Sequence, residues 1–241
     1  MQGSVVVAKI RKSEFTKLEI IKVATLRFLL KGYSSTTVKA IADELEMSTG
    51  NLTFYYPSKE HLLAELTDLL CRFQWKMMEV EADEGISSLL ALCLELTTLA
   101  SICQGNEIAK DFFVSSYQSP ICLDIIHFND TERAKNIFAE YCGDWSEEKF
   151  ASAEILVAGI EYATLVASDG EVPLETRISA ALNQIMLIYN VPENIRKTEI
   201  RKALATDYNS LGKRIIKGFI EFVEKTNEQA FEDMLNKRNM P

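Results

Sequence analysis

Residues 32–63 read GYSSTTVKAIADELEMSTGNLTFYYPSKEHLL, and this stretch decides how the rest of the chain is interpreted. Its first half has apolar residues at the spacing of one helical face, namely Val38, Ile41 and Leu45. Thr36 or Thr37 can cap the start of this helix, which is expected to end near Glu46. The pattern therefore predicts a short amphipathic helix that is too small to bury a core alone.

A second short helix follows at once and exposes a polar and aromatic face. Ser48 can cap its first turn, Leu52 and Tyr56 face inward one turn apart, and Pro57 forbids its continuation. The outer face carries Ser48, Thr49, Asn51, Thr53, Phe54 and Tyr55. Gly50 lets the backbone come close to a ligand. In a major groove an Asn can pair with adenine and hydroxyls can reach bases or phosphates, so the pair of helices is predicted to be a helix-turn-helix that reads DNA.

The same residues resemble the N-terminal DNA-binding domain of the TetR family of transcriptional regulators, over about 50 residues when the preceding helix is included. The matching motifs are GY at 32–33, TTV at 36–38, IA at 41–42, MSTGNL at 47–52, YY at 55–56, SKE at 58–60 and LL at 62–63. The resemblance implies that Lys59, with its side chain free, contacts a phosphate beside the reading helix. Thr37 is also expected to be a DNA-binding residue. Family members often have Lys at the position of Thr49 and Tyr at that of Thr53.

The resemblance also divides the chain into two domains. Residues 1–57 form a three-helix head, whose first helix is expected at about 13–31 after a flexible arm, 1–12. The arm carries Lys9, Arg11 and Lys12, which either reach phosphates or a minor groove or form a merely frayed terminus. Residues 58–241 form a helical effector-binding and dimerisation domain. Its first helix, from Ser58 to about residue 82, is the expected lever between head and body.

Charge is segregated along the chain. The formal net charge is −9, but residues 1–60 hold nine Lys or Arg and six Asp or Glu, a net of +3. The remaining residues hold 17 and 29, a net of −12. A basic end on an acidic body is compatible with phosphate binding at one face, because exposed charges beyond a Debye length are largely screened.

The body is predicted to be helical throughout, so the fold class is all-α. The expected helices are 86–104, 106–117, 120–128, 131–142, 146–168, 173–189, 192–206 and 208–236. No GxGxxG, GxxxxGK[ST], GxSxG or HExxH motif occurs, and two histidines leave little general-base chemistry. We therefore expect no enzyme, no cofactor and no metal.

Several features indicate a cytoplasmic protein. The five cysteines form no CxxC pair and are expected to be reduced, buried thiols. No uninterrupted apolar run is longer than 155–160, which is far too short to span a membrane, so no transmembrane helix or membrane partner is expected. The apolar triplet at 5–7 precedes its positive charges, and no signal peptide is expected.

Two late helices are candidates for a homodimer interface, as the TetR resemblance implies. Small residues recur every four positions in the first, and apolar residues recur at helical spacing in the second. They are Gly159, Ala163, Ala167, Ile178, Ala181, Ile185 and Ile188. The alternative is that the same residues pack inside one subunit.

TetR-like bodies usually enclose a small-molecule pocket behind the lever helix. Aromatic residues that could line it are Trp75, Phe112, Phe113, Tyr117, Phe128 and Tyr141. Glu95, in an apolar run, would suit a cationic or amine-bearing ligand. The alternative is an aromatic core with Glu95 at the surface or paired. Glu154 and Glu161, a heptad apart, are interpreted as a narrow polar stripe.

Together these features predict a ligand-responsive repressor that binds a near-palindromic operator as a homodimer and is released by a small-molecule effector. Two alternatives remain open. The head could read a protein partner, as the acidic body and Thr49 in place of Lys suggest. The chain could also be an all-α ligand-binding protein that binds no operator.

Overall fold

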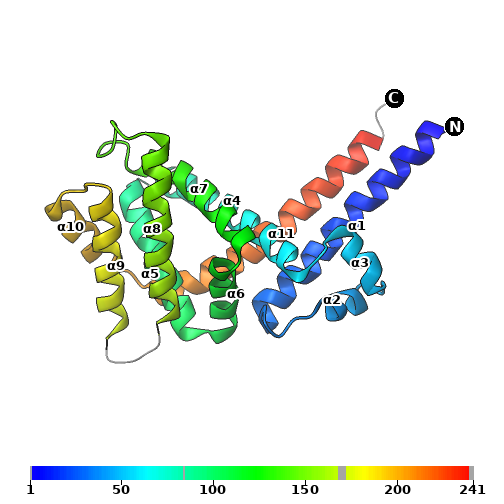
Figure 1. Cartoon of the computed structure of the whole chain (residues 1–241), viewed down its shortest axis with the longest axis horizontal. Coiled ribbons are helices and arrows are strands. Elements are labelled where there is room, and N and C mark those ends of the chain that lie inside the picture. Colours follow the sequence, from blue (N-terminus) through cyan, green and yellow to red (C-terminus); the bar gives the residue numbers. More distant parts are fainter. Residues whose placement is uncertain (1, 84, 168–171, 239–241) are drawn as a thin grey trace.

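The computed structural model describes residues 2–83, 85–167 and 172–238, and the side chains of these residues except 2–12, 78, 79, 81–83, 227 and 230–238. The described residues form only α-helices, so the predicted all-α fold is confirmed. The helices are α1 (Gln2–Lys31), α2 (Val38–Glu44), α3 (Thr49–Tyr55), α4 (Lys59–Asp83), α5 (Ser88–Gly105), α6 (Glu107–Gln118), α7 (Pro120–Ile137), α8 (Glu147–Val166), α9 (Leu174–Ile188), α10 (Glu193–Leu204) and α11 (Tyr208–Arg238). Figure 1 shows α1–α3 at one end of the molecule and α8–α10 at the other.

Both short helices of the head begin at their predicted caps. The Thr37 hydroxyl accepts a hydrogen bond from the backbone N–H of Ala40 at 3.1 Å, and Ser48 accepts one from Asn51 at 3.1 Å. Each bond satisfies an amide that the first turn would otherwise leave unpaired. Helix α2 ends two residues before the expected position, and Glu46 adopts a left-handed φ of 51° in the tight turn before α3.

Helix α1 provides the core on which α2 and α3 rest. Phe28, Ile41 and Leu52 are fully buried in one hydrophobic cluster. The helix begins at Gln2 rather than near residue 13, because no proline or second glycine interrupts residues 4–31. The side chains of the expected arm, 1–12, lie outside the described residues, and its contact with DNA stays a prediction.

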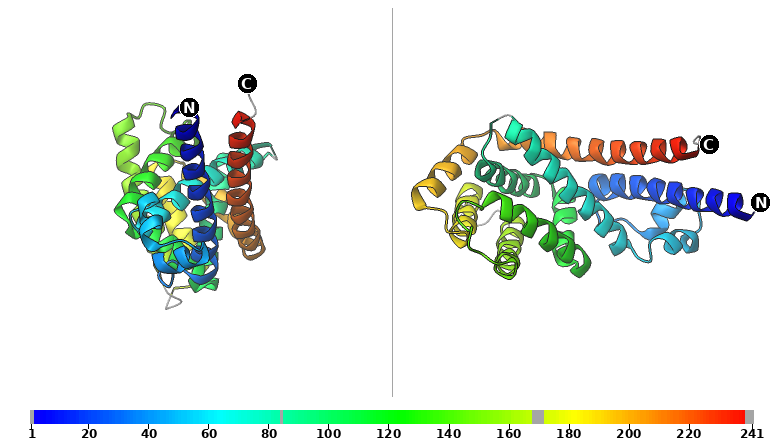
Figure 2. Two further views of the ribbon diagram at one scale, coloured as in Figure 1. Left: turned by 90° about the vertical axis from the view of Figure 1, so that its right-hand side faces the viewer. Right: turned by 90° about the horizontal axis from the view of Figure 1, so that it is seen from above.

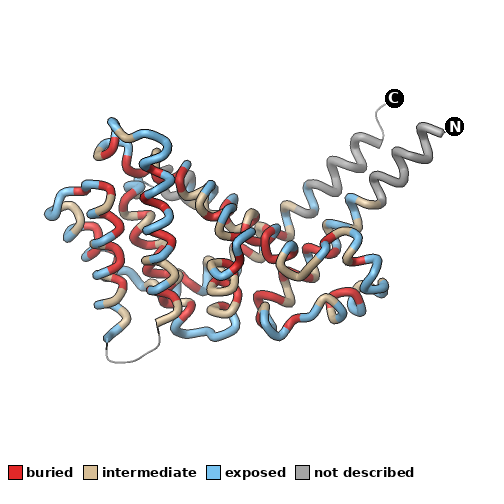
Figure 3. The backbone as a smooth tube through the Cα atoms, in the orientation of Figure 1, coloured by how far each residue is buried: buried red, intermediate tan, exposed pale blue. Residues whose placement is uncertain are grey.

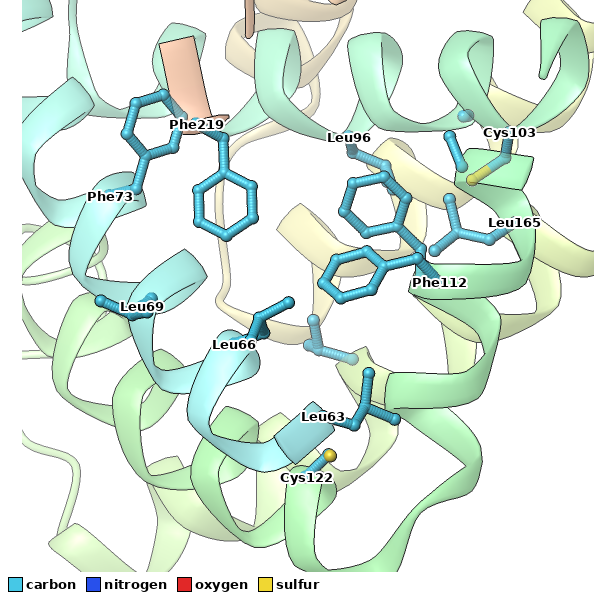
Figure 4. Packing of buried hydrophobic residues seen from close by; sticks show 14 of the residues in the cluster. Leu63, Leu66, Leu69, Phe73, Leu96, Cys103, Phe112, Cys122, Leu165 and Phe219 are labelled. Atoms are coloured by element: carbon cyan, nitrogen blue, oxygen red, sulfur yellow. The ribbon is translucent and has the colours of Figure 1, made fainter. Parts of the chain in front are cut away.

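Helix α4 joins the head to the body, as expected of a lever. It packs against α7, α5, α11, α6 and α1. On its inner face Leu62, Leu66, Leu69 and Phe73 are buried. Figure 4 shows three of these side chains, with Leu63, facing the core formed with α6 and α11.

The body is built around α5, which packs against α6, α8, α9, α10 and α11. By length and composition α5 is apolar enough to cross a membrane, in contrast to the expectation from short apolar runs, but 56% of it is buried inside the fold. Figure 3 shows buried residues concentrated where α5, α8 and α9 face one another. All five cysteines are free and buried, which confirms the expected thiols.

Helix α7 corrects the sequence prediction of two helices at 120–128 and 131–142. It runs without a break from Pro120 to Ile137. At the expected break the Asn129 side chain donates to the carbonyl oxygen of Ile125 at 2.9 Å, within the same helix. Neither glycine nor proline stands there to stop the helix.

The last helix, α11, returns from the body to the head. Its described part packs on α5 and α4, and it runs beside α1, as the second view in Figure 2 shows. Phe219 and Phe222 lie 5.7 and 5.6 Å from Phe73 of α4, measured between ring centroids. Helix α11 therefore contacts both α1 of the head and the lever helix α4.

Candidate DNA-binding surface and effector cavity

The outer face of α3 is open to solvent, as the sequence predicted. Leu52 is fully buried, whereas the predicted DNA-contacting residues Ser48, Thr49, Gly50, Asn51 and Phe54 are exposed. Phe54 is 79% exposed. Its ring and that of Tyr55 form a T-shaped pair, with the ring centroids 5.4 Å apart. Thr53 and Tyr55 are half-buried, and the Thr53 hydroxyl donates to the carbonyl oxygen of Gly50 at 3.2 Å. The predicted reading face is therefore accessible to a partner, and its contact with DNA stays a prediction.

Lys59 differs from the expectation of a free side chain. Its ammonium group donates to the carbonyl oxygen of Tyr33 at 2.9 Å and lies 4.1 Å from the centroid of the Tyr33 ring. Burial lowers the pKa of Lys59, against an opposing effect of Asp111. The ammonium has further donors to offer, so a phosphate contact stays a prediction. Thr37 is exposed at the start of α2, where its hydroxyl can still donate.

A hydrogen-bonded contact ties the head to the body through α6. The Asp111 carboxylate on α6 accepts hydrogen bonds from the Ser34 backbone N–H at 2.7 Å and from the Ser34 hydroxyl at 2.5 Å. Within the body, the Ser119 hydroxyl at the start of α7 donates to the Glu60 carboxylate of α4 at 2.6 Å. Gly32 has a φ of +94°, and a Cβ there would lie 3.0 Å from the Asp111 carboxylate. The connection between α1 and α2 is thus fitted closely to α6.

The body encloses a polar cavity of about 40 Å³ between α4, α5, α6, α7, α8 and α9. Its polar lining residues are Gln74, Glu95, Tyr117, Asp130, Arg133, Glu154, Glu161 and Tyr189. Arg133 forms an ion pair with both carboxylate oxygens of Glu95 and a weaker one with Asp130 at 3.3 Å. Gln74 donates to Glu95 at 2.5 Å. Glu95 is therefore paired, the alternative that the sequence left open.

Protonation in this cavity is set by burial and by neighbouring carboxylates. Burial, then Asp130, raises the pKa of Glu154 to about 7. Burial, followed by Asp130 and Glu154, raises the pKa of Glu161 well above its ordinary value. Burial also raises the pKa of Asp130 to about 6, although Arg133 opposes this rise. Burial alone would lower the pKa of Arg133, but Glu95 and Asp130 hold it above its usual value.

A second cavity, of about 60 Å³, lies between α4, α5, α6 and α11 and is mostly apolar. Its apolar lining includes Leu70, Phe73, Met77, Leu94, Ile102, Phe113, Leu211 and Ile215. Gln74, Glu95 and Leu99 line both cavities, which therefore adjoin.

The structure brings together three of the predicted ligand residues. Glu95 and Tyr117 line the polar cavity and Phe113 lines the apolar one, whereas Phe112 is fully buried core. The other three line neither cavity, since Trp75 and Tyr141 are half-buried elsewhere and Phe128 is 70% exposed.

The residues that sequence reasoning missed are the buried charges. Arg133 looks like any surface arginine in the sequence, because its partner Glu95 is 38 residues away. Glu154 and Glu161 did give a signal, their heptad spacing in an apolar helix, but it was interpreted as a polar stripe. Their positions in the cavity wall show that the same spacing describes an inward face.

The predicted dimer residues divide between two faces. Gly159 and Ala163 on α8 are exposed, and Ala167 and Ile188 are half-buried. Ile178, Ala181 and Ile185 are buried within the subunit. This is the alternative that the sequence left open, and it corrects the prediction that these residues of α9 form the dimer interface. Their face of α9 completes the body core. The residues that α8 and α9 leave exposed instead include Ile155, Leu156 and Leu187.

An exposed helix-turn-helix on an all-α body defines the class of helical transcriptional regulators. Residues 20–66 match the family model described as bacterial regulatory proteins, tetR family. The match covers the head and the start of α4, so residues 20–66 carry a TetR-type DNA-binding domain.

Two solved structures are similar to the chain. One is Thermus thermophilus FadR, a TetR family transcriptional repressor, in complex with lauroyl-CoA. It is 18% identical, with a TM-score of 0.55 over 73% of this chain and 96% of that chain. The other is a gamma-butyrolactone receptor, an ArpA-like protein, which is 19% identical with a TM-score of 0.43 over 80% of this chain and 96% of that chain. No curated protein matches the sequence.

Proposed function

We propose that this protein is a TetR-family repressor that binds a near-palindromic operator as a homodimer and is released by a small-molecule effector. The observation that carries the proposal is the exposed face of α3, where Ser48 and Asn51 stand in solvent at the locally basic end of the chain. Asn51 would pair with a base edge, and Ser48, Thr49 and Thr37 would contact phosphates or bases.

The proposed dimer forms through the exposed face of α8 and α9. Ile155 and Leu156 are 59% and 60% exposed, and Leu187 is 48% exposed. A Cβ at Gly159 would meet nothing within 4 Å, so another backbone can approach there. For operator binding, two-fold pairing of this face must place the two α3 helices in successive major grooves, about 34 Å apart.

Helix α6 is the proposed link between effector and head. Tyr117 near its end donates to the Glu161 carboxylate at 2.8 Å in the polar cavity. Asp111 holds Ser34 of the head about 9 Å further along the same helix axis. An effector that displaces Tyr117 would therefore shift Asp111 and the head with it. Tenfold relief of repression requires that the effector favour the non-binding state by about 1.4 kcal/mol.

The test is selection from random-sequence DNA, followed by binding measurements on the recovered sequences with the native chain and Asn51→Ala. The proposal predicts an inverted repeat whose half-sites lie about one helical turn apart. It also predicts that Asn51→Ala enriches a less defined sequence. Recovery of no sequence would favour the two alternatives, a protein-interaction module or a ligand-binding protein without an operator.

A further inference from the structure

The two adjoining cavities share a wall but differ in chemistry. The polar cavity is lined by four carboxyl groups and one guanidinium, and the other cavity is lined mainly by aliphatic and aromatic side chains. At about 40 and 60 Å³ each cavity is large enough to hold more than one water-sized group. A ligand that filled both would be short, polar at one end and apolar along its body.

The positively charged side chain that lines the polar cavity, Arg133, is already paired with carboxylates. Arg133 pairs with Glu95 and Asp130, which leaves Glu154 and Glu161 without an ion pair among the described residues. Each of these two carboxyl groups accepts a hydrogen bond from a tyrosine hydroxyl, Glu154 from Tyr189 and Glu161 from Tyr117. Glu154 is buried and Glu161 is half-buried, and carboxylates withdrawn from water need a positive partner or must hold a proton. The cavity therefore lacks positive charge rather than negative charge.

Thr98 is a separate indication of a ligand in the apolar cavity. Its side chain lines the cavity and is only 1% exposed, yet its hydroxyl has no hydrogen-bond partner among the described residues. Its neighbour Thr97 donates to the carbonyl oxygen of Cys93 at 2.6 Å, as buried helical threonines commonly do. An unpaired buried hydroxyl costs stability. A ligand group that bonds to Thr98 would remove this cost.

We infer that the two cavities form one site for an organic cation, with a protonated amine paired to Glu154 and Glu161 and an apolar body that carries a hydrogen-bonding group toward Thr98. The inference rests on the proposed function only in taking this ligand to be the effector. The charge balance opposes an anionic ligand, because a buried anion needs a positive partner and the guanidinium of Arg133 is already paired with Glu95 and Asp130.

Binding of the cation should release protons. In the empty cavity the raised pKa values of Glu154 and Glu161 keep these groups protonated near neutral pH. An ammonium group would favour their ionised forms, while the amine itself stays charged below about pH 10. Affinity should therefore rise with pH between about pH 5 and 7, by up to about tenfold per pH unit for each proton released. The groups that face Glu154 and Glu161 and enter this balance are Glu95, Tyr117, Asp130, Arg133 and Tyr189.

The first experiment is calorimetric titration of the full chain, without DNA, with hexylamine and 6-amino-1-hexanol. Hexanoate and 1,6-diaminohexane are the controls. Hexanoate carries a negative instead of a positive charge at its polar end, and 1,6-diaminohexane would put a second positive charge in the apolar cavity. We expect a dissociation constant of about 1 mM for the amines, typical of ligands with about eight non-hydrogen atoms, and weaker binding of both controls. The amino alcohol should bind tighter than hexylamine, and Thr98→Val should remove that difference. Equal or tighter binding of hexanoate, or no amine binding, would overturn the inference.

The second experiment compares Glu161→Gln with Glu148→Gln, an exposed residue of the same helix. Glu161→Gln should weaken hexylamine binding about tenfold and reduce proton release, as measured in buffers of different ionisation enthalpy, without lowering the thermal midpoint. Glu148→Gln should change neither. If Glu161 were merely structural, its variant would unfold at lower temperature and retain the pH dependence, which would contradict the inference.

The proposed regulator function and the proposed cation site can be refuted independently. Amine binding that leaves operator affinity unchanged would support the cation site and refute its effector role. Operator binding by a chain that binds no amine would overturn the cation site and leave the proposed regulator intact.

Discussion

Glu154→Gln should remove a pH-dependent loss of stability that the polar cavity imposes. Glu154 is 5% exposed, and burial with the nearby Asp130 raises its pKa from an ordinary value of 4.5 to about 7. Because the folded chain keeps a proton that the unfolded chain has lost, this residue contributes most stability below pH 4.5. The contribution falls as pH rises to about 7 and is then constant.

The size of the loss follows from the two pKa values. Their difference corresponds to about 3 kcal/mol of unfolding free energy, at about 1.36 kcal/mol per pKa unit. Glutamine resembles the protonated acid and can still accept the hydrogen bond from Tyr189. Glu154→Gln should therefore match the native chain at pH 4.5 and exceed its stability by up to about 3 kcal/mol at pH 8.

The assay is urea unfolding at pH 4.5, 6 and 8, at one protein concentration because a dimer couples stability to concentration. Glu148→Gln, exposed at the start of the same helix, should follow the native chain at every pH. A Glu154→Gln variant that loses stability in parallel with the native chain, or is less stable at pH 8, would refute the reasoning.

Three further substitutions test the other contacts. Leu156→Glu puts a charge on the exposed apolar face, and two-fold symmetry brings two copies of this charge into the proposed contact. Sedimentation should therefore show a monomer, and a dimer as tight as the native one would exclude this face as the dimer interface. Asp111→Ala removes the acceptor of two Ser34 hydrogen bonds and should lower the unfolding free energy by about 1.5 to 3 kcal/mol, while an unchanged thermal transition would count against this junction. Lys59→Ala should weaken binding to all DNA sequences alike and should reduce the slope of log affinity against log salt concentration by about 1. An unchanged slope would show that Lys59 contacts no phosphate.

The head could be predicted closely because its signals are local. The hydroxyls of Thr37 and Ser48 cap helices that start one residue later, and Pro57 ends the second helix. Each of these effects acts within a few residues of the chain, so the sequence alone contains it. Lys59 is the exception, because its contact with Tyr33 closes a loop of 26 residues that sequence spacing does not reveal.

The effector region could be predicted only in outline because its chemistry is assembled from distant helices. Glu95 was singled out as a carboxylate within an apolar run, and it does line the polar cavity, but its pairing with Arg133 depends on how the helices pack. Apolar periodicity on α9 likewise shows a buried face without showing what buries it. Ile178 and Ile185 turn inward to their own subunit, whereas Leu187 remains exposed. Only the packed structure distinguishes an interface from a core.

The most direct test of the account is a fluorescence anisotropy titration of the selected operator at two salt concentrations, with the native chain and with Asn51→Ala. The account predicts that affinity falls steeply with salt, that the native chain prefers the operator to a scrambled duplex, and that Asn51→Ala weakens operator binding by roughly 1 to 3 kcal/mol and reduces this preference. Equal affinity of the native chain and Asn51→Ala, with no preference for either duplex, would contradict the claim that α3 reads DNA.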